Sequence, residues 1–528
     1  MASKILISDP LAEEGIKILR EEKDFTVDSK PKLPPEELKK IVGEYDALIV
    51  RSETKVTKDI LKSAKKLKYI GRAGVGLDNV DVDEASKMGI IVMNAPGGNM
   101  VSTAEHTLSL ILSLSRNIPQ ADASLKKGEW SRKKFMGVEL YGKTLGIIGL
   151  GRIGTEVARR ALSFQMKVIA CDPYLIPEKA KSLGIESVDL DTLFKASDYI
   201  TVHTPLTEDT RHVIDANAFK KMKKGVRIIN CARGGIIDEG ALGEGIESGI
   251  VAGAALDVYE NEPPGQSKLV CMDKVVTTPH LGASTEEAQV NVSVDIAQSI
   301  RDAIMRRGIR NAVNIPCIEP ELFKIIEPYL NLAEKIGSMH AQLQEGSVSK
   351  IKIKYVGDIV QYDLNHMTRS IVKGLLGRTL EESVNYVNAL VVSKERGIKI
   401  TEEKTKEVED FANLIIVEVQ TSKTKNSIMG TLFTKIDPRI VKINQFYVDA
   451  FPEGHMLVIY NTDKPGIVGQ IGTLLGKNNI NIAGMNFGRT KRGGDAITLL
   501  NIDSAVPEKV LGKIKKMRYI KEVKYVKL

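Results

Sequence analysis

The sequence predicts an α/β protein in which two doubly wound parallel sheets are followed by two smaller α+β units. Three observations lead to this prediction. Strand-like and helix-like runs alternate over residues 1–97, and they alternate again over residues 98–282. Such alternation is typical of βαβ units that build a parallel sheet. After Pro316 the rhythm changes, and residues 453–528 follow the order βαββαβ of a ferredoxin-like module.

Composition excludes several classes of protein. The chain has 528 residues, enough for about three or four domains. Its 75 basic and 67 acidic residues leave a net charge of only +8, and its lysine clusters lack interleaved aromatics, so we expect solvated helix faces and not a nucleic-acid surface. The four cysteines show no C-x-x-C spacing, and the chain start lacks a signal peptide's apolar core. We therefore expect a cytoplasmic protein with reduced thiols and without a membrane partner, because no apolar run is long enough to span a bilayer.

The first predicted sheet belongs to a discontinuous outer domain. Residues 94–98, Asn-Ala-Pro-Gly-Gly, form a natural hinge after it. A helix-like stretch over residues 285–307 could cross back to this sheet, so we expect one domain of residues 1–97 and 283–315 and a cleft beside it. The expected strands are residues 4–8, 47–51 and 69–72, and the expected helices are residues 11–20 and 58–64.

The second predicted sheet, in residues 98–282, carries a dinucleotide fingerprint. An apolar strand over residues 144–148 ends in the pattern G-x-G-x-x-G, and a helical pattern follows. Gly149 permits the tight turn, Gly151 lets the backbone approach a pyrophosphate, and Gly154 lets helix and strand pack closely. The following helix offers its N-terminal N–H groups to the phosphates. A second strand over residues 166–170 leads to Asp172, which can accept both ribose hydroxyls and would repel a 2′-phosphate, so a Rossmann-like domain that prefers NAD to NADP is expected.

Later strands of the same sheet are expected at residues 199–202, 226–230 and 252–257, and a further strand is expected to end at Thr278. Three polar groups follow the last three of these strands in turn. They are Arg233, Glu262 and His280. Ligands of doubly wound folds bind at the carboxyl ends of strands. His280 suits a general base, Glu262 suits a carboxylate that orients the imidazole, and Arg233 suits a bidentate anchor for a substrate carboxylate. Together they fit hydride transfer between NAD and a 2-hydroxy acid. His203 is a rival base, but we interpret its loop as lying over the cofactor.

The third region, residues 316–452, contains β-rich runs and no catalytic cluster. The expected runs are residues 348–355, 412–419 and 442–450. Lys435, Arg439 and Lys442 could bind an anion, although solvated charges are the favoured interpretation. In residues 453–528 the expected strands are residues 455–461, 480–488, 496–503 and 521–527, and the expected helices are residues 467–476 and 507–516.

The chain resembles the D-isomer-specific 2-hydroxy acid dehydrogenase family over nearly its whole length, and within it the members that act on D-3-phosphoglycerate. The segments that carry the resemblance are residues 50–52, 71–76, 149–154, 231–235, 257–263 and 279–284. The resemblance implies that Arg233 and His280 are catalytic and that Glu262 pairs with the histidine. It further implies that NAD is contacted by Arg152, Ile153, Asp172, Thr204, Cys231 and Asp257.

The resemblance also implies a substrate. Arg51 and Arg72 stand at strand ends, and Asn99 follows the hinge glycines, where they would bind 3-phosphoglycerate. Arg132 matches a basic residue that reaches the phosphate from a dimer partner, so a homo-oligomer, a dimer or a tetramer, is implied. The implied reaction is oxidation to 3-phosphohydroxypyruvate, the first step of L-serine biosynthesis. The alternatives are a hydroxypyruvate or glyoxylate reductase of the same family, and a non-catalytic NAD-sensing regulator.

The last two regions resemble the intervening domain and the ACT domain of the longer family members. By this resemblance Asn461, Asp463 and Asn481 would hold L-serine at an interface between two ACT modules. Family members often carry histidine or asparagine at the first two positions, so the affinity for serine stays open. No metal site is expected.

Overall fold

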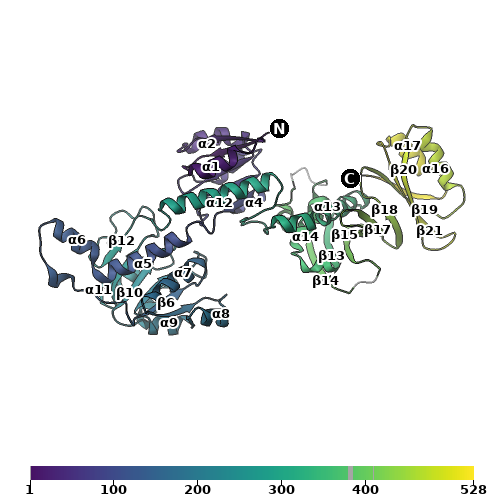
Figure 1. Ribbon diagram of the computed structural model, residues 1–528. Coiled ribbons are helices and arrows are strands. Elements are labelled where there is room, and N and C mark those ends of the chain that lie inside the picture. Colours follow the sequence, from purple (N-terminus) through teal and green to yellow (C-terminus); the bar gives the residue numbers. More distant parts are fainter. Residues whose placement is uncertain (1, 379–383, 408–409) are drawn as a thin grey trace.

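The computed structural model describes residues 2–378, 384–407 and 410–528. The chain forms four sheets in sequence order, and Figure 1 shows them spread along an elongated molecule. The two sheets of the N-terminal half lie at one end, the six-stranded sheet lies in the middle, and the four-stranded sheet lies at the other end. The expected fold class is confirmed.

The first sheet has five parallel strands in the order β2-β1-β3-β4-β5. These strands are β1 (Ser3–Ile7), β2 (Phe25–Ser29), β3 (Ala47–Val50), β4 (Tyr69–Arg72) and β5 (Ile91–Asn94). The helices around it are α1 (Glu13–Arg20), α2 (Pro35–Ile41), α3 (Lys58–Ser63), α4 (Val82–Lys87) and α12 (Glu286–Ile304). Helix α12 follows the second sheet in the chain but packs on the first, where Ile296 and Ile300 share a core with Ile5 and Ile49. The helix therefore physically links the two sheets.

The second sheet has seven parallel strands in the order β12-β11-β10-β9-β6-β7-β8. These strands are β6 (Thr144–Ile148), β7 (Lys167–Cys171), β8 (Glu186–Ser187), β9 (Tyr199–Val202), β10 (Val226–Asn230), β11 (Val251–Leu256) and β12 (Val275–Thr277). The strand order reverses at β6 and β9, which is where a doubly wound sheet opens a crevice for ligands. The helices of this part are α5 (Met100–Arg116), α6 (Ile118–Lys126), α7 (Arg152–Ser163), α8 (Pro177–Ser182), α9 (Leu190–Ala196), α10 (Ala216–Lys221) and α11 (Glu239–Glu247).

The third sheet is mixed, in the order β14-β13-β15-β16-β17-β18. Its strands are β13 (Val348–Gly357), β14 (Lys399–Thr405), β15 (Asn413–Thr421), β16 (Lys425–Leu432), β17 (Pro438–Ile443) and β18 (Phe446–Ala450). Three helices accompany it: α13 (Pro320–Leu343), α14 (Asn365–Leu376) and α15 (Ala389–Glu395). Gly337 and Gly374 allow α13 and α14 to touch, because a Cβ on Gly337 would lie 2.0 Å from the Ile371 carbonyl oxygen.

The β-rich run expected over residues 442–450 is present, but it is not a single strand. Asn444 turns the chain with a φ of 51° and separates β17 from β18 as a hairpin. Asparagine tolerates this left-handed conformation, which explains the turn. The long helix α13 was not anticipated. Its buried face, which includes Leu332, Ile336 and Met339, packs on the sheet.

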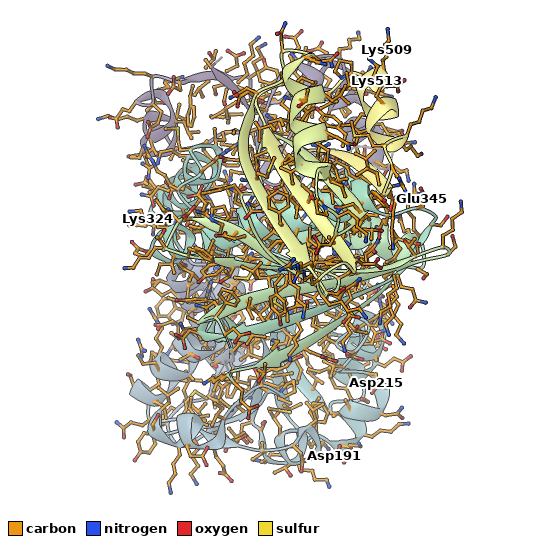
Figure 2. The ribbon with its side chains drawn as sticks, turned by 90° about the vertical axis from the view of Figure 1, so that its right-hand side faces the viewer. Asp191, Asp215, Lys324, Glu345, Lys509 and Lys513 are labelled. Atoms are coloured by element: carbon orange, nitrogen blue, oxygen red, sulfur yellow. The ribbon has the colours of Figure 1, made fainter. Side chains whose placement is uncertain are left out.

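The fourth sheet confirms the order βαββαβ. Its elements are β19 (His455–Thr462), α16 (Ile467–Gly476), β20 (Ile482–Arg489), β21 (Asp495–Ile502), α17 (Glu508–Lys515) and β22 (Ile520–Lys527). Gln342 of α13 ties this module to the third sheet, because its side-chain amide donates to the Lys527 carbonyl at 3.0 Å and its oxygen accepts from the Lys527 N–H at 2.9 Å. Figure 2 shows the module in front, with Lys509 and Lys513 at its outer edge and Glu345 near the junction, where Glu345 pairs with Lys524 at 3.0 Å.

The third region also contacts the first sheet's domain. The Asn385 amide donates to the Gly89 carbonyl at 2.8 Å, and the Asn388 amide donates to the Lys87 carbonyl at 3.1 Å. Within the three described ranges, no helix combines the length and apolarity needed to cross a bilayer.

Candidate active site

A cavity of about 460 Å³ lies between the first two sheets. The carboxyl ends of the second sheet's strands supply one wall, through the glycine loop and the loops after β9, β10 and β11. The hinge and the loop after β4 supply the other wall. The lining includes most residues that the sequence singled out: Asn99, Arg152, Ile153, His203, Thr204, Cys231, Arg233, Asp257 and His280.

The glycine loop has the shape that a pyrophosphate needs. Gly149 has a φ of +90°, and a Cβ on Gly154 would lie 2.2 Å from the Gly149 carbonyl oxygen, so larger residues cannot replace either glycine without a shift. A Cβ on Gly151 would meet no protein atom within 4 Å, which leaves open space beside its backbone. Helix α7 begins at Arg152 without a side-chain cap, so its first N–H groups are available to an anion.

Asp172 lies just beyond the end of β7 and fixes the glycine loop. Its carboxylate accepts the Leu150 N–H at 2.8 Å through one oxygen and the Tyr174 N–H at 2.8 Å through the other. Each carboxylate oxygen has two lone pairs, so Asp172 can still accept from ribose hydroxyls.

Several buried polar atoms around the cavity have no protein partner. They are Arg51 Nε, Arg72 Nε, Asn99 Oδ1, His203 Nδ1 and Thr204 Oγ1. Buried polar groups are nearly always hydrogen-bonded in folded proteins, so a cluster of exceptions points to a ligand. Together with the open glycine loop, this donor and acceptor set fits a dinucleotide and an anionic substrate.

His280 and Glu262 form a direct pair. His280 Nδ1 lies 2.8 Å from Glu262 Oε2, and the other Glu262 oxygen accepts the Tyr259 N–H at 3.2 Å. With Nδ1 engaged, Nε2 of His280 is the nitrogen that remains to take a proton. Arg233 is fixed on both sides, since its Nε donates to Asp78 at 3.1 Å and its Nη1 donates to the Ala232 carbonyl at 2.7 Å.

Asp257 organises the turn that carries His280. Its Oδ1 accepts the Leu281 N–H at 2.7 Å, its Oδ2 accepts the Gly282 N–H at 2.8 Å, and its carbonyl accepts the His280 N–H at 2.9 Å. Burial alone would raise the pKa of the Asp257 carboxyl, but hydrogen bonds from His106, Thr278 and Leu281 outweigh burial and hold the pKa below its ordinary value. Besides its expected contact with NAD, Asp257 therefore has a structural role, which is to fix the turn that carries His280.

From the first sheet's domain, Arg72 comes close to Arg233, and Arg51 comes close to Arg72. Burial, together with the charges of Arg233 and Arg51, lowers the pKa of Arg72 to about 10 despite the opposing charge of Asp78. Burial also lowers the pKa of Arg51, which lines a neighbouring hollow with Thr285 and Gln289. Guanidinium groups that crowd one another in this way favour an anion between them.

Two other sequence candidates lie differently. Burial lowers the pKa of His203 to about 4, so its imidazole stays neutral at ordinary pH, and its Nε2 lies 3.0 Å from Thr201 Oγ1. Arg132 is exposed in the short 3-10 helix Arg132–Phe135 and does not line the cavity of its own chain. That Arg132 reaches the site of a dimer partner stays a prediction.

Sequence comparison decides the family. A family model described as D-isomer specific 2-hydroxyacid dehydrogenase, NAD binding domain, matches residues 108–282. The D-3-phosphoglycerate dehydrogenase intervening domain matches residues 325–444, and the ACT domain matches residues 455–518. The chain is 46% identical over 528 residues to D-3-phosphoglycerate dehydrogenase of Archaeoglobus fulgidus, covering 99% of this chain and 100% of the relative. The chain belongs to the D-3-phosphoglycerate dehydrogenase family.

Other relatives of this family agree. The D-3-phosphoglycerate dehydrogenase of Methanocaldococcus jannaschii is 45% identical over 526 residues, covering 99% of this chain and 100% of the relative. Among solved structures, D-lactate dehydrogenase from Aquifex aeolicus, complexed with NAD and lactic acid, is 31% identical with a TM-score of 0.51, covering 57% of this chain and 96% of that chain. The NAD expectation is confirmed by the NAD-binding family model.

The ACT module does not bring its three candidate effector residues together. Strands β19 and β20 both pair antiparallel with β21, so they run parallel, and Ile482 and His455 both pair with Ile502. Asn481 therefore lies at the opposite end of the sheet from Asn461 and Asp463, roughly 25 Å away for eight strand residues. The expected serine site between two ACT modules stays a prediction, in which Asn481 would come from the second module.

The basic residues of the intervening domain are mostly occupied. Arg439 is buried, pairs with Asp437 at 2.6 Å and with Asp449 at 3.1 Å, and lies over the Phe451 ring. Lys442 lies over the Tyr447 ring, 4.3 Å from its centroid, and Lys435 is exposed. Arg439 is thus neither a solvated charge nor an open anion ligand.

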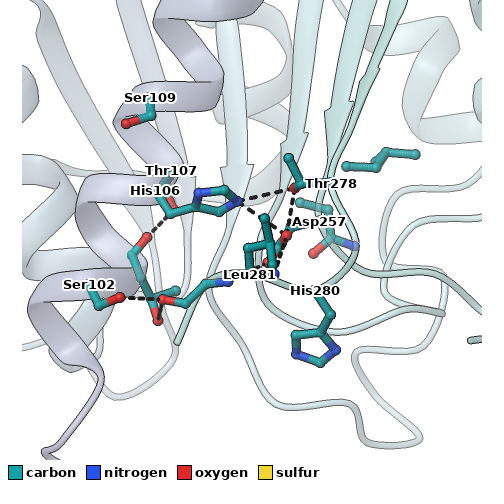
Figure 3. Close-up of polar contacts among 12 residues, drawn as sticks. Ser102, His106, Thr107, Ser109, Asp257, Thr278, His280 and Leu281 are labelled. Carbon is teal, nitrogen blue, oxygen red and sulfur yellow. Dashed lines mark hydrogen bonds and ion pairs between the residues drawn. The ribbon is translucent and has the colours of Figure 1, made fainter. Parts of the chain in front are cut away.

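Sequence reasoning missed two residues of the site. Asp78 braces Arg233 from the first sheet's domain, and His106 of α5 reaches Asp257 and Thr278 (Figure 3). Neither belongs to a motif with a fixed spacing to its partner, because each contact joins segments more than 150 residues apart.

Proposed function

We propose that this protein oxidises D-3-phosphoglycerate to 3-phosphohydroxypyruvate with NAD, the first step of L-serine biosynthesis. The observation that carries the proposal is the His280–Glu262 pair beside an open glycine loop, with Arg233, Arg72 and Arg51 close together next to it. The full-length relatives, which are 45–46% identical to this chain, are named D-3-phosphoglycerate dehydrogenases, and this supports D-3-phosphoglycerate as the substrate.

The chain's residues divide the chemistry between them. Arg233 holds the substrate carboxylate, with its orientation set by Asp78 and the Ala232 carbonyl. Nε2 of His280 takes the proton from the C2 hydroxyl, and Glu262 stabilises the resulting imidazolium through Nδ1. NAD, when bound, supplies the acceptor for the hydride that leaves C2. The hydroxyl carbon becomes a carbonyl, the hydride carries two electrons, and one proton stays on His280 until water removes it.

The phosphate selects the substrate. Arg51 and Arg72 lose water contact on burial and regain a charge partner when a phosphate binds. Asn99 lines the same cavity, and its unpartnered Oδ1 can accept a hydrogen bond from the substrate. In our proposal Arg132 of the partner subunit completes the phosphate site.

The domain roles and the assembly belong to the same proposal. Residues 1–97 and 283–315 bind substrate, residues 98–282 bind NAD, residues 316–452 form the regulatory intervening domain, and residues 453–528 form the ACT domain, which would respond allosterically to L-serine. A cytoplasmic homotetramer, or at least a dimer, is proposed. The exposed apolar side chains of Trp130, Met136 and Tyr141, which are near Arg132 in the sequence, support a surface that another copy covers.

Steady-state assays of the purified protein test this function. NAD and NADP are each offered with D-3-phosphoglycerate, D-glycerate and D-lactate, and NADH is offered with hydroxypyruvate and glyoxylate. We expect kcat/KM to be highest by far for NAD with D-3-phosphoglycerate. Faster reduction of hydroxypyruvate or glyoxylate would identify a reductase, and NADH binding without any turnover would identify a non-catalytic sensor.

A further inference from the structure

The turn that carries His280 is attached to helix α5, the helix that follows the hinge. Three α5 side chains reach this turn. Ser102 and Thr103 donate their hydroxyls to the Gly282 carbonyl at 2.8 and 3.1 Å. His106 Nε2 lies 3.2 Å from Asp257 Oδ1 and 3.1 Å from Thr278 Oγ1. Figure 3 shows the His106 imidazole reaching from the helix to Asp257 and Thr278, with His280 on the same turn.

The hydrogen-bond partners of His106 determine which of its ring nitrogens carries the proton. Thr278 Oγ1 donates its single proton to Asp257 Oδ1 at 2.6 Å, so the hydroxyl can only accept from another partner. Asp257 is an ionised carboxylate, which also only accepts. Both neighbours of His106 Nε2 are therefore acceptors, and Nε2 must carry the proton and donate to both.

This hydrogen-bond network is needed because the backbone conformation of His280 is unfavourable without stabilising contacts. His280 is not glycine, yet its φ is +55°, a left-handed conformation that persists only when the surroundings hold it. Asp257 stabilises this conformation. Its backbone carbonyl accepts the His280 N–H, and its carboxylate accepts the N–H groups of Leu281 and Gly282. The carboxylate can hold the turn only if its own orientation is fixed, and the donors that fix it are His106 and Thr278.

We propose that His106 is a positioning residue for the dehydrogenase reaction: by donating Nε2–H to Asp257 and Thr278, it holds the turn that aims His280 at the substrate. The inference rests on the proposed function, in which His280 is the base. It also links the hinge to the base, because α5 begins directly after Asn99.

Two variants of His106 distinguish the loss of its hydrogen-bond donor from the loss of side-chain volume. Gln carries its amide nitrogen where His carries Nε2, whereas the Asn amide ends one bond earlier and cannot reach Asp257. We expect His106→Asn to lower kcat about 10- to 100-fold, as misplacement of a catalytic group does. We expect His106→Gln to restore most of the turnover. The Kd for NADH, measured by fluorescence, should change little in either variant.

A second readout does not depend on turnover. Hydrogen exchange of the segment 278–284 reports the N–H groups that Asp257 accepts. We expect faster exchange in His106→Asn than in the wild type, with near wild-type protection in His106→Gln, all measured well below the lowest melting temperature. Wild-type kcat and wild-type exchange in His106→Asn would overturn the inference. Equal loss in both variants, or exchange that rises along all of α5, would show a merely structural role. If the wild type does not oxidise D-3-phosphoglycerate, the proposed function fails, and the exchange arm still decides whether His106 holds the turn.

Discussion

The catalytic cleft and the ACT module differ in whether their candidate ligand-binding side chains have hydrogen-bond partners within the chain. In the cleft, Arg51, Arg72 and Asn99 each keep a buried polar atom without a protein partner. In the ACT module, the candidate effector residues are occupied within the chain. Asp463 accepts from Arg489 and from the Gly493 N–H, both at 3.0 Å, and the Asn481 amide donates to Asp503 at 2.7 Å.

The difference distinguishes a site that one chain builds, apart from the proposed contribution of Arg132 of the partner subunit, from a site that two copies would share. A buried polar group without a partner costs free energy, and in the cleft a bound ligand would offset that cost. Asp463 and Asn481 carry no such cost, because each is paired within the chain. Hydrogen bonds from the Gly493 N–H and Arg489 lower the pKa of Asp463, which is consistent with this local pairing.

The largest expected effect is in the cleft. Replacing His280 with alanine should lower kcat about 100- to 10,000-fold, because the general base is lost, while the Kd for NADH stays within a few-fold. Steady-state kinetics and NADH fluorescence measure the two quantities. His203→Asn is the matched control, since burial lowers the pKa of His203 to about 4 and we predict that it does not serve as the base. A loss as large in His203→Asn would reverse the assignment.

The arginines should come second. Charge-assisted hydrogen bonds are worth about 1.5–3 kcal/mol, so Arg72→Gln should lower kcat/KM for D-3-phosphoglycerate roughly 10- to 100-fold. The same variant should change kcat/KM for D-glycerate far less, because that substrate lacks the phosphate. Arg20→Gln, at an exposed pair with Glu13 outside the cleft, is the control. Equal losses on both substrates would remove Arg72 from the phosphate site.

Asp172 should have a smaller effect that appears as cofactor preference. We expect Asp172→Asn to keep the Leu150 and Tyr174 contacts in part, to weaken NAD about tenfold, and to narrow the preference for NAD over NADP. The ratio of kcat/KM values for the two cofactors measures it. A wild type that uses NADP as well as NAD would contradict the role of Asp172.

Acid should weaken the protein through two buried histidines. Burial lowers the pKa of His203 and of His340 from 6.5 to about 4. Between about pH 6.5 and pH 4 the unfolded chain therefore binds more protons than the folded chain, and the free energy of unfolding falls as pH falls. His340→Gln can keep the donation to the Val417 carbonyl, and its melting temperature should fall less steeply with acid than that of the wild type. Parallel pH curves would contradict this.

The effector residues should change basal turnover least. Asn481→Ala should leave kcat without L-serine near the wild-type value, because Asn481 lies in the ACT module far along the chain from the cleft, and it should weaken serine binding in calorimetry. Asn478→Ala, on the exposed helix-strand turn before β20, is the control. No heat from the wild type at millimolar serine would leave the module a purely structural role.

Much of the fold follows from local patterns. Strands such as β4 and β9 begin and end where alternation and apolar runs place them, and the glycine loop has a fixed spacing with Asp172. Helix α13 was not predicted because its buried face is defined by packing on the sheet. The β17–β18 hairpin was not predicted because it depends on one asparagine, Asn444, in a left-handed conformation. His280 and Glu262 could be paired because each stands in a recognisable motif, residues 279–284 and 257–263, whereas Asp78 and His106 act across distant segments that no periodicity connects.

The parallel run of β19 and β20 has a consequence for how the protein would sense an effector. If the two halves of each effector site come from different copies, binding and assembly are linked by mass action. Dilution would then weaken the response to L-serine even at constant serine, and serine would in turn hold the copies together. Sensitivity to the end product would thus track the amount of enzyme in the cell as well as the amount of product.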